Sequence, residues 1–231
     1  ETLTPRGYPI FARRPCLDSN YYETYNRENV TLVDCIKDPI LEITEKGVRT
    51  DKGEYELDIL ILATGYDGLT GALTAFDVVG KDGQTVNQKW KDGAKSYLGI
   101  LMEGFPNLFM ITGPGSPSVL SNMMVSIEQH VDWIADCLAH LRAEGLDSIE
   151  ATPTAQAGWV QHVNDFANIS LLPKANSWYM GANVPGKPRR FMAYAGGLHT
   201  YTDICNTVRD KGWQGFVIGR GDQVLSESRV F

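Results

Sequence analysis

The chain lacks the patterns that mark a self-contained nucleotide-binding domain, a metal finger or a membrane span. It holds no Gly-x-Gly-x-x-Gly turn, the strand-to-helix junction at which dinucleotide-binding domains cradle phosphate. No Cys-x-x-Cys pair occurs, which excludes a zinc finger and favours free thiols in a reducing cytoplasm for Cys16, Cys35, Cys137 and Cys205. No apolar run reaches roughly 18 residues, so we expect neither a membrane span nor a signal peptide.

Positive charge is scarce as well. The 21 Lys and Arg residues are outnumbered by 28 Asp and Glu, which gives a formal net charge of −7. This balance argues against a general surface for nucleic acids or anionic membranes. With 43% hydrophobic, 10% aromatic and 21% charged residues, the 231-residue chain has an ordinary globular composition and is long enough for one large domain or parts of two.

One stretch, Asp58–Asp67, organises the rest of the chain. Four consecutive aliphatic residues run into Ala63-Thr64-Gly65, and a short unbroken apolar run is typical of a strand buried on both faces of a parallel sheet. Gly65 lets the backbone turn sharply, and ligands of open α/β sheets lie beyond the carboxyl ends of such strands. From these residues alone, a ligand-binding strand end and a core strand with an ordinary turn fit equally well.

Turn and periodicity patterns predict the remaining elements. Residues 1–29 are expected to form a long ordered connection, 171–200 an irregular tract, and 219–231 a polar, frayed tail. Small antiparallel strands are expected over 40–57. Further strands are predicted at Asn29–Asp34, Asp58–Ala63, Asn107–Thr112 and Gly215–Ile218.

Helices are predicted at about Ser118–Ala143, Thr152–Ile169 and Thr202–Lys211. The first is the longest, and Gly145 is expected to end it. Its apolar residues alternate by four and three, so we expect one stripe to face the core: Leu120, Met124, Ile127, Val131, Ile134, Leu138 and Leu141.

Three further motifs accompany the Ala63-Thr64-Gly65-Tyr66-Asp67 strand end. They are Arg13-Arg14 with the following Leu17–Val30 segment, then Gly113–Met124, and then Ser177–Arg189. Together these motifs resemble the Baeyer–Villiger monooxygenases, most like the cyclohexanone and phenylacetone type, over about residues 3–218. The resemblance implies an α/β fold, namely the C-terminal portion of a Rossmann-like flavoprotein with two dinucleotide-binding domains.

The same resemblance implies domain boundaries. Residues 1–11 would be a linker or the end of a helical insertion. Residues 12–58 would be the C-terminal segment of the NADPH-binding domain and 59–218 the C-terminal segment of the FAD-binding domain, with 219–231 as a tail. Since the phosphate-cradling glycine turns are missing, we expect a longer protein whose two pyrophosphate sites lie upstream of residue 1. The isolated fragment is therefore expected to be inactive.

The activity that the resemblance implies is insertion of one oxygen atom of O₂ next to a ketone carbonyl, giving an ester or lactone through a C4a-peroxyflavin. FAD and NADPH are the implied cofactors, a small-molecule ketone and O₂ the implied partners, and the cytoplasm the implied location. No nucleic acid, membrane span or metal is expected.

In this family the arginine that matches Arg14 reaches over the flavin, where a guanidinium stabilises the anionic peroxide and adduct without losing its charge. Its neighbour, matching Arg13, meets the 2′-phosphate of NADPH. Alternatively, Arg13 and Arg14 are a solvated basic pair.

The Gly113–Met124 motif joins a strand end to a helix N-terminus, where unpaired N–H groups and the positive end of the dipole point outward. It may be read as a capped helix start or, by the resemblance, as a contact with the flavin. The implied cofactor contacts here are Ser118, Asn122 and Met123, joined from the earlier strand end by Thr64, Gly65 and Asp67. The implied ketone pocket is bordered by Val119, Leu120 and Met124.

Ser177–Arg189 resembles the family's mobile loop, whose tryptophan, here Trp178, closes over the nicotinamide cofactor. Lys187 and Arg189 would then assist phosphate binding. The run Gly181-x-x-x-x-Gly186-Lys187 imitates a P-loop, but Pro188 replaces the magnesium-binding Ser or Thr and Pro185 has no N–H to offer phosphate. The alternative for Trp178 is a hydrophobic plug.

Two other functions stay open. A related N- or S-oxygenating flavin monooxygenase would share the strand end but is expected to lack the Trp178 loop and to need no Arg14. A non-catalytic fragment or interaction domain is the second alternative. His130, His140, His162 and His199 show no metal-ligand spacing and are expected to be structural or exposed.

Overall fold

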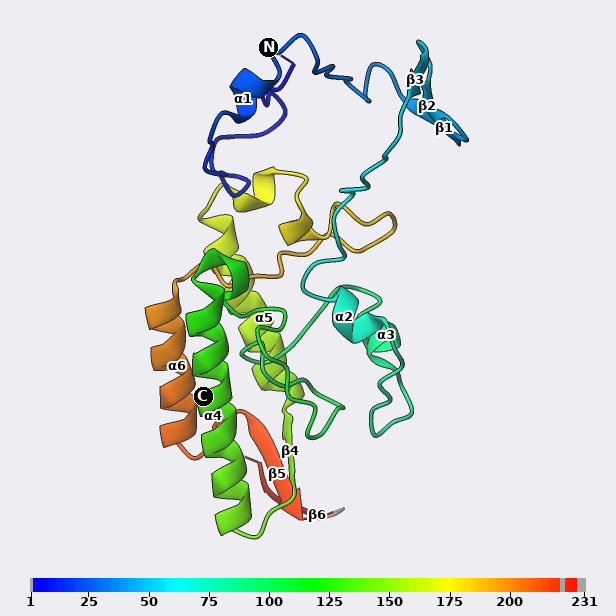
Figure 1. Ribbon diagram of the computed structural model, residues 1–231. Coiled ribbons are helices and arrows are strands. Elements are labelled where there is room, and N and C mark those ends of the chain that lie inside the picture. The colour runs from blue at the N-terminus through cyan, green and yellow to red at the C-terminus, as the bar shows by residue number, and fades with distance from the viewer. Residues whose placement is uncertain (1, 221–222, 228–231) are drawn as a thin grey trace. The chain divides into compact units, whose positions relative to one another are not determined.

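A computed structural model describes residues 2–220 and 223–227 of the chain, which divides into two compact units (Figure 1). Unit 1 comprises Glu1–Gly7 and Arg14–Gly65, and unit 2 comprises Tyr8–Arg13 and Tyr66–Phe231. The domain boundaries expected at residues 12, 59 and 219 concern a different division and stay predictions.

Unit 1 contains a short helix, α1 (Tyr21–Thr24), and a three-stranded antiparallel sheet in the order β1-β2-β3 (Ile40–Thr44, Gly47–Thr50 and Glu54–Glu56). The small antiparallel excursion predicted over 40–57 is thus confirmed. Its second turn is anchored by the buried Asp38, whose Oδ1 accepts a hydrogen bond from the Lys52 N–H at 2.9 Å.

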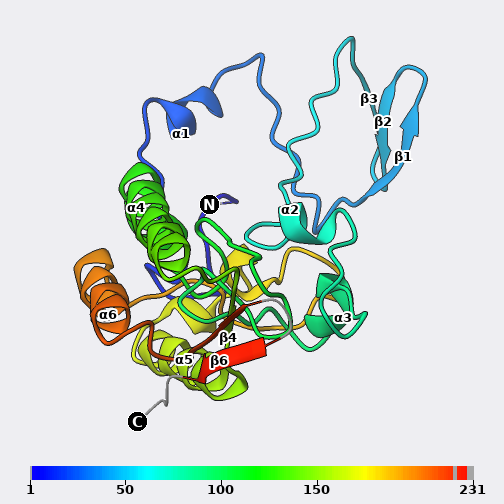
Figure 2. The same ribbon diagram turned by 90° about the horizontal axis from the view of Figure 1, so that it is seen from below.

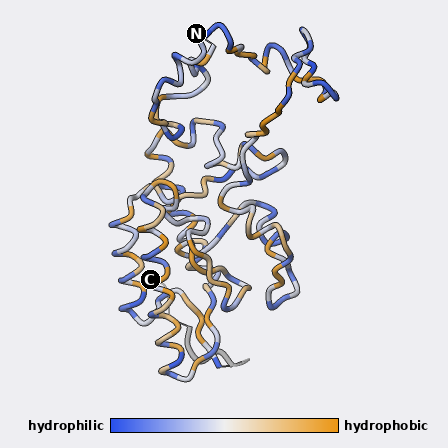
Figure 3. The backbone as a smooth tube through the Cα atoms, in the orientation of Figure 1, coloured by the Kyte–Doolittle hydropathy of each residue, from blue (hydrophilic) through white to orange (hydrophobic). Residues whose placement is uncertain are grey.

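Two predicted strands of unit 1, Asn29–Asp34 and Asp58–Ala63, do not form in this structure. In the second of them Ile59 and Ile61 are 78% and 82% exposed, and Figure 3 shows the hydrophobic stretch that follows β3. A strand forms only when a neighbouring strand satisfies its backbone groups, and the described residues place no strand beside either segment. The apolar run therefore predicts burial that the described residues do not provide.

Unit 2 is built around three helices and a second antiparallel sheet in the order β4-β5-β6 (Ser148–Ala151, Phe216–Arg220 and Gln223–Glu227). The helices are α4 (Met123–Ala143), α5 (Pro153–Asn168) and α6 (Leu198–Asp210), and Figures 1 and 2 show α4 and α6 side by side. The main core between them is rich in aromatic rings, including Tyr97, Trp133, Trp159, Tyr194, Tyr201 and Phe216. A smaller cluster, Val86, Trp90, Met102, Phe105 and Met110, packs near α2 (Gly71–Thr74) and α3 (Val86–Lys89).

The long predicted helix begins later than expected. Ser118–Leu120 is a short 3-10 turn, η1, and α4 starts only at Met123 because Asn122 caps it, with its side-chain oxygen accepting from the Met124 N–H at 3.1 Å. The predicted end is confirmed, since α4 stops at Ala143 and Gly145 follows with a positive φ of 63°.

The predicted core-facing stripe of α4 is confirmed only in part. Leu141 is buried and Leu120 and Ile134 pack against the main core, whereas Met124, Val131 and Leu138 are 65%, 46% and 50% exposed. The buried face of α4 comprises Ser126, His130, Trp133, Cys137 and Leu141. It includes the polar Ser126 and His130 because hydrogen-bond partners satisfy them, so an apolar stripe alone does not define this face.

The other predicted helices are confirmed. Thr152 caps α5, accepting from the Ala155 N–H at 3.1 Å, and Pro153 occupies the first turn. The helix predicted at Thr202–Lys211 is α6, which begins earlier, at Leu198. Two 3-10 turns, η2 (Leu172–Lys174) and η3 (Trp178–Met180), interrupt the expected irregular tract.

The predictions for strands of unit 2 are mixed. Gly215–Ile218 corresponds to β5, whereas β4 was not foreseen. The tail predicted as frayed contains β6, which pairs with β5, and its residues 221–222 and 228–231 lie outside the described part. Asn107–Thr112 is not a strand, because Asn107 and Thr112 have φ values of 61° and 53°, which strand geometry forbids.

Within the described residues, no helix combines the length and apolarity that crossing a membrane requires.

Candidate functional site

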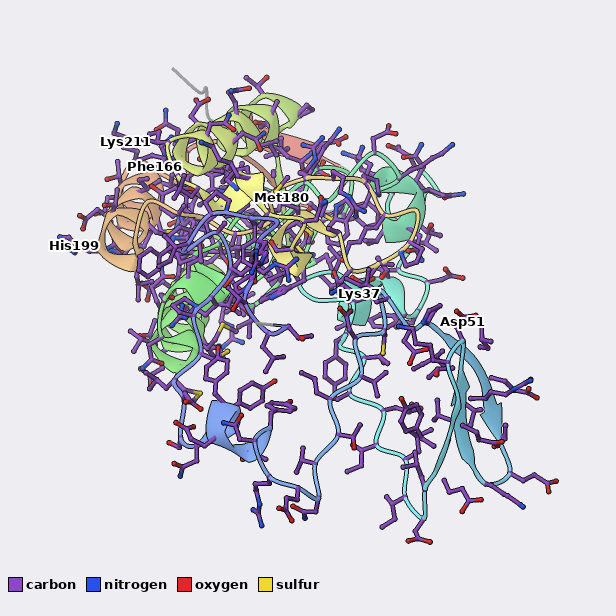
Figure 4. The ribbon with its side chains drawn as sticks, turned by 90° about the horizontal axis from the view of Figure 1, so that it is seen from above. Lys37, Asp51, Phe166, Met180, His199 and Lys211 are labelled. Atoms are coloured by element: carbon purple, nitrogen blue, oxygen red, sulfur yellow. The ribbon has the colours of Figure 1, made fainter. Side chains whose placement is uncertain are left out.

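The loop Ser177–Arg189 is an ordered structure within unit 2. It opens with η3, whose left-handed cap is Gly181 with φ 70°. Tyr179 is fully buried, and its ring lies 4.4 Å from that of Trp178, centroid to centroid. Trp178 is itself partly buried against the main core, and Figure 4 shows Met180 of the same turn among packed side chains.

Lys187 ties the far end of this loop to the segment that follows Gly65. Its Nζ forms an ion pair with Asp67 Oδ1 and lies 2.6 Å from Thr70 Oγ1. The Thr70 hydroxyl also donates to Asp67 Oδ1 at 3.1 Å. The Lys187 and Asp67 side chains are only 14% and 35% exposed, so the pair is partly shielded from water.

Two further contacts join the same two segments. The Asn183 side-chain amide donates to the Tyr66 carbonyl at 2.7 Å. Gly68 packs so closely against the indole of Trp178 that a Cβ at this position would lie 2.8 Å from Trp178 Cε3. The strand-end motif and the tryptophan motif, identified separately in the sequence, are thus in direct contact.

Arg13 approaches the start of this loop. Its Nη2 donates to the carbonyl of Asn176, the residue before Ser177, at 2.8 Å, and its guanidinium lies 4.3 Å from the ring centre of Tyr8. Arg13 therefore lies next to the start of the Ser177–Arg189 loop, and its role as a cofactor residue stays a prediction. Arg14, Thr64 and Gly65 belong to unit 1, and their roles stay predictions.

The Gly113–Pro117 turn is fixed next to the chain that leaves the loop. The Gly115 N–H donates to the Met192 carbonyl at 2.9 Å, and the Tyr194 N–H donates to the Ser116 carbonyl at 2.7 Å. The Trp159 indole N–H donates to the Gly115 carbonyl at 3.1 Å. The turn before α4 is consequently held rigidly by backbone hydrogen bonds.

The predicted flavin and ketone residues after this turn differ in exposure. Ser118 is fully buried, with Oγ 3.9 Å from Met123 Sδ, and Asn122 spends its side chain on the helix cap. Val119 and Leu120 pack partly buried against the main core, whereas Met124 is exposed. Met124 is thus absent from the core stripe predicted for it and stays a predicted pocket residue.

The two candidate phosphate ligands, Lys187 and Arg189, differ in how many internal contacts they already make. Lys187 is already engaged by Asp67 and Thr70, so a phosphate would have to compete with three internal contacts. Arg189 is exposed and donates from Nη1 to the Gly181 carbonyl at 2.7 Å. Both remain predictions as cofactor ligands, and Arg189 would give up fewer internal contacts to bind a phosphate.

One buried hydroxyl beside Trp178 has no hydrogen-bond partner among the described residues. Ser177 is 5% exposed and its Oγ is unsatisfied. A buried polar atom without a partner is costly, so a water molecule or a bound group is expected to satisfy it. Together with the guanidinium of Arg13, this hydroxyl fits a polar, anionic cofactor at the Trp178 loop.

Sequence reasoning missed a polar network in the core. His130 Nδ1 accepts from the Thr112 N–H at 2.9 Å, and its Nε2 lies 2.7 Å from the hydroxyl of Tyr201, which donates to the Leu98 carbonyl. The imidazole is therefore neutral with its proton on Nε2. Burial lowers the pKa of His130 to about 4. No sequence spacing would have found these contacts, which join α4 to α6 across 71 residues.

The other histidines are not part of one site. His162 lies 3.3 Å from the Tyr194 hydroxyl, and burial lowers its pKa, whereas His199 is exposed on α6, as Figure 4 shows. Within the described residues, no group of three or more His, Cys, Asp or Glu side chains is placed to hold a metal ion.

Comparison with known proteins relates these features to a family. No family model matches the chain. A Baeyer–Villiger monooxygenase of Pseudooceanicola batsensis is 42% identical over 221 residues, which cover 95% of this chain and 40% of that protein. Cyclohexanone 1,2-monooxygenase of an Acinetobacter species is 41% identical over 210 residues, covering 90% and 38%. A phenazine N-monooxygenase of Lysobacter antibioticus is 39% identical, with the same coverage. The chain thus spans about two fifths of the length of these curated relatives.

Solved structures agree. An oxidised steroid monooxygenase bound to NADP matches with a TM-score of 0.86 and 48% identity, and closed cyclohexanone monooxygenase with 0.90 and 40%; each match covers 95% of this chain and 41% of the other. A complex of the monooxygenase OTEMO with FAD and NADP matches with 0.89 and 34%, over 94% and 40%. The resemblance seen in the sequence is confirmed: over nearly its whole length, the chain is homologous to the C-terminal portion of the Baeyer–Villiger monooxygenases, flavoproteins with two dinucleotide-binding domains.

Proposed function

We propose that the protein containing this chain is an FAD- and NADPH-dependent Baeyer–Villiger monooxygenase. It would insert one oxygen atom of O₂ next to the carbonyl of a small-molecule ketone and release an ester or lactone. The observation that carries the proposal is the 42% identity to a Baeyer–Villiger monooxygenase across 95% of the chain. The NADP and the FAD in similar solved structures support the same cofactors here. We further propose a cytoplasmic location.

The flavin supplies the oxygen chemistry when bound. The chain's own residues bind and orient the cofactors and the ketone, and they stabilise the charge that develops in the reaction. Arg14 stabilises negative charge that develops as the ketone reacts, because a guanidinium keeps its charge and its fork geometry at any working pH. Arg13 selects NADPH through the 2′-phosphate. Its contact with Asn176 places that positive charge beside the Trp178 loop, which supports the assignment.

The remaining predicted residues have supporting roles. Trp178 covers the nicotinamide cofactor and excludes water, with Arg189 and Lys187 assisting at phosphate. The flavin contacts are Thr64, Gly65, Asp67, Ser118, Asn122 and Met123. Val119, Leu120 and Met124 border the ketone. The exposure of Met124 and the partial burial of Leu120 are compatible with an apolar pocket that other parts of the protein complete.

A second candidate is N-oxygenation. It is favoured by the 39% identity to a phenazine N-monooxygenase, which has the same coverage as the cyclohexanone enzyme. An N-oxygenating enzyme would attack an electron-rich nitrogen rather than a carbonyl, and it would not need a nucleophilic, negatively charged oxidant. The role proposed for Arg14 therefore separates the two candidates.

The test uses the full-length protein with FAD, NADPH and ¹⁸O₂. A panel of cyclic ketones and N-heteroaromatic compounds is incubated and analysed by mass spectrometry. The proposal expects a lactone carrying one ¹⁸O atom from at least one ketone. N-oxides without any lactone would select the second candidate, and a protein that purifies without flavin and oxidises nothing would favour a non-catalytic role.

A further inference from the structure

The contacts around Lys187 point to a second function for this side chain, besides the assistance at phosphate proposed above. Lys187 stands nine residues after Trp178 and is held by Asp67 and Thr70, which precede and open the α2 region. We propose that Asp67, Thr70 and Lys187 are positioning residues that form a latch, and that this latch holds the Ser177–Arg189 loop with Trp178 in its covering position. The inference rests on the proposed function only for what Trp178 covers.

The first support is the geometry of the latch. Thr70 is buried and contacts both members of the ion pair, so it orients the carboxylate and the ammonium at once. The Lys187 side chain retains only 14% of its exposure. An ion pair that is partly desolvated and completed by a hydroxyl contributes more to stability than a fully exposed surface pair.

The second support is that the same two segments meet at three points. Lys187 contacts Asp67, Asn183 donates to the Tyr66 carbonyl, and Gly68 lies under Trp178. The contacts come from three consecutive residues, 66–68, and reach the loop at Trp178, Asn183 and Lys187, so the loop is held near each of its ends. Breaking the ion pair would release the Lys187 end and leave Trp178 held from one side.

The absence of a side chain at Gly68 lets the Trp178 indole pack directly against the backbone. A Cβ there would lie 2.8 Å from Cε3 of Trp178, closer than real Cβ atoms approach, and 3.1 Å from Cζ3. A side chain of any size at position 68 therefore displaces the Trp178 ring from its packed position. Residues 67 and 68 thus act on the loop in two ways. Gly68 leaves room for the Trp178 indole, and the Asp67 carboxylate binds Lys187.

The latch is distinguished from direct phosphate binding by a double-mutant cycle. If Asp67 and Lys187 act as one unit, Asp67→Asn, Lys187→Gln and the double variant should have the same effect, because each removes the same interaction. If Lys187 is instead a phosphate ligand, Lys187→Gln alone should weaken NADPH binding and Asp67→Asn should leave it unchanged or tighten it.

The experiment measures site-specific trypsin cleavage of the full-length protein by mass spectrometry. Trypsin can cut after Arg189 and Arg190 but not after Lys187, because Pro188 follows it. When opening is fast, cleavage reports the population of the open loop. All three latch variants are expected to accelerate cleavage at Arg189 and Arg190 by about tenfold, without added effect in the double variant. Glu103→Gln is the matched control, since it breaks the Lys89–Glu103 pair of similar exposure elsewhere in unit 2 and should leave this rate unchanged.

A second arm tests the seat of Trp178. Gly68→Ala is compared with Gly158→Ala, which lies within α5 with no heavy atom within 4 Å of an added Cβ. The proposal expects about a tenfold higher KM for NADPH in the first variant and an unchanged KM in the second. Unaltered cleavage in the single latch variants, or fully additive effects in the double variant, would overturn the latch. Because cleavage needs no turnover, this result stands even if the protein oxidises no ketone.

Discussion

Arg13 donates a hydrogen bond to the backbone carbonyl of Asn176 at 2.8 Å, although 163 residues separate them. The contact joins the arginine proposed to select NADPH to the loop that carries Trp178. Under the proposed function Arg13 would have two tasks, its charge meeting a phosphate while one of its N–H groups fixes the loop. Cofactor selectivity and loop order are therefore expected to change together when Arg13 is altered.

Arg13→Ala should raise the KM for NADPH roughly 10- to 100-fold more than the KM for NADH, which should rise only through the loosened loop. The expected size follows from the loss of a charge-assisted hydrogen bond, worth about 1.5–3 kcal/mol. Steady-state kinetics with both cofactors measures the ratio. Arg6→Ala is a control for the loss of one positive charge. Equal losses with NADPH and NADH would show that Arg13 does not read the 2′-phosphate.

Arg14→Ala should lower kcat for ketone oxidation by about 10²–10³-fold, because it removes a fixed donor from developing negative charge. Arg14→Lys should recover little, since an ammonium lacks the planar fork of the guanidinium. The measurement is lactone formation at saturating NADPH and ketone. Flavin reduction by NADPH should stay near its normal rate in both variants, and an unchanged rate of lactone formation in Arg14→Ala would refute the proposed role.

Local chemistry made several elements predictable from the sequence. Thr152-Pro153 marks the start of α5 and Gly145 the end of α4 because capping depends on neighbouring residues alone. The hairpin turns over 40–57 are local in the same sense. The family motifs were also visible, since each is a contiguous run of residues.

Non-local features could not be predicted in this way. The buried face of α4 includes His130, which donates to Tyr201 of α6, and such a polar contact leaves no apolar pattern in the sequence. Asp67 and Lys187 are 120 residues apart and form no pattern together. The apolar run at Asp58–Ala63 correctly indicates a need for burial, yet whether a strand forms depends on neighbours that the described residues do not supply.

The two buried thiols are expected to resist alkylation. Cys137 and Cys205 are fully buried, and burial raises the pKa of each to about 12, so the reactive thiolate is scarce at neutral pH. Iodoacetamide at pH 7.5 followed by mass spectrometry should label neither in the folded protein and both in guanidinium chloride. Labelling of either residue in the native state, at the rate of the denatured control, would contradict the packing of α4 against α6.

The buried His130 makes the protein sensitive to mild acid. Its folded pKa of about 4 lies below the unfolded value of 6.5, so between these values the unfolded chain binds a proton that the folded chain does not. The free energy of unfolding should therefore be highest above pH 6.5 and fall as the pH drops towards 4, by roughly 3 kcal/mol from this residue. Urea unfolding of the full-length protein from pH 7 to 4.5 measures the slope.

The matched comparison for that slope is His130→Gln with His199→Gln. Glutamine can still accept from the Thr112 N–H and donate to Tyr201, but it does not titrate, so His130→Gln should flatten the dependence on pH. His199 is exposed beside Asp203, 3.5 Å away, and its loss should leave the slope almost intact. If both variants lose stability in acid as steeply as the parent, protonation of His130 is not what opens the core, and the carboxylates of unit 2 become the groups to examine.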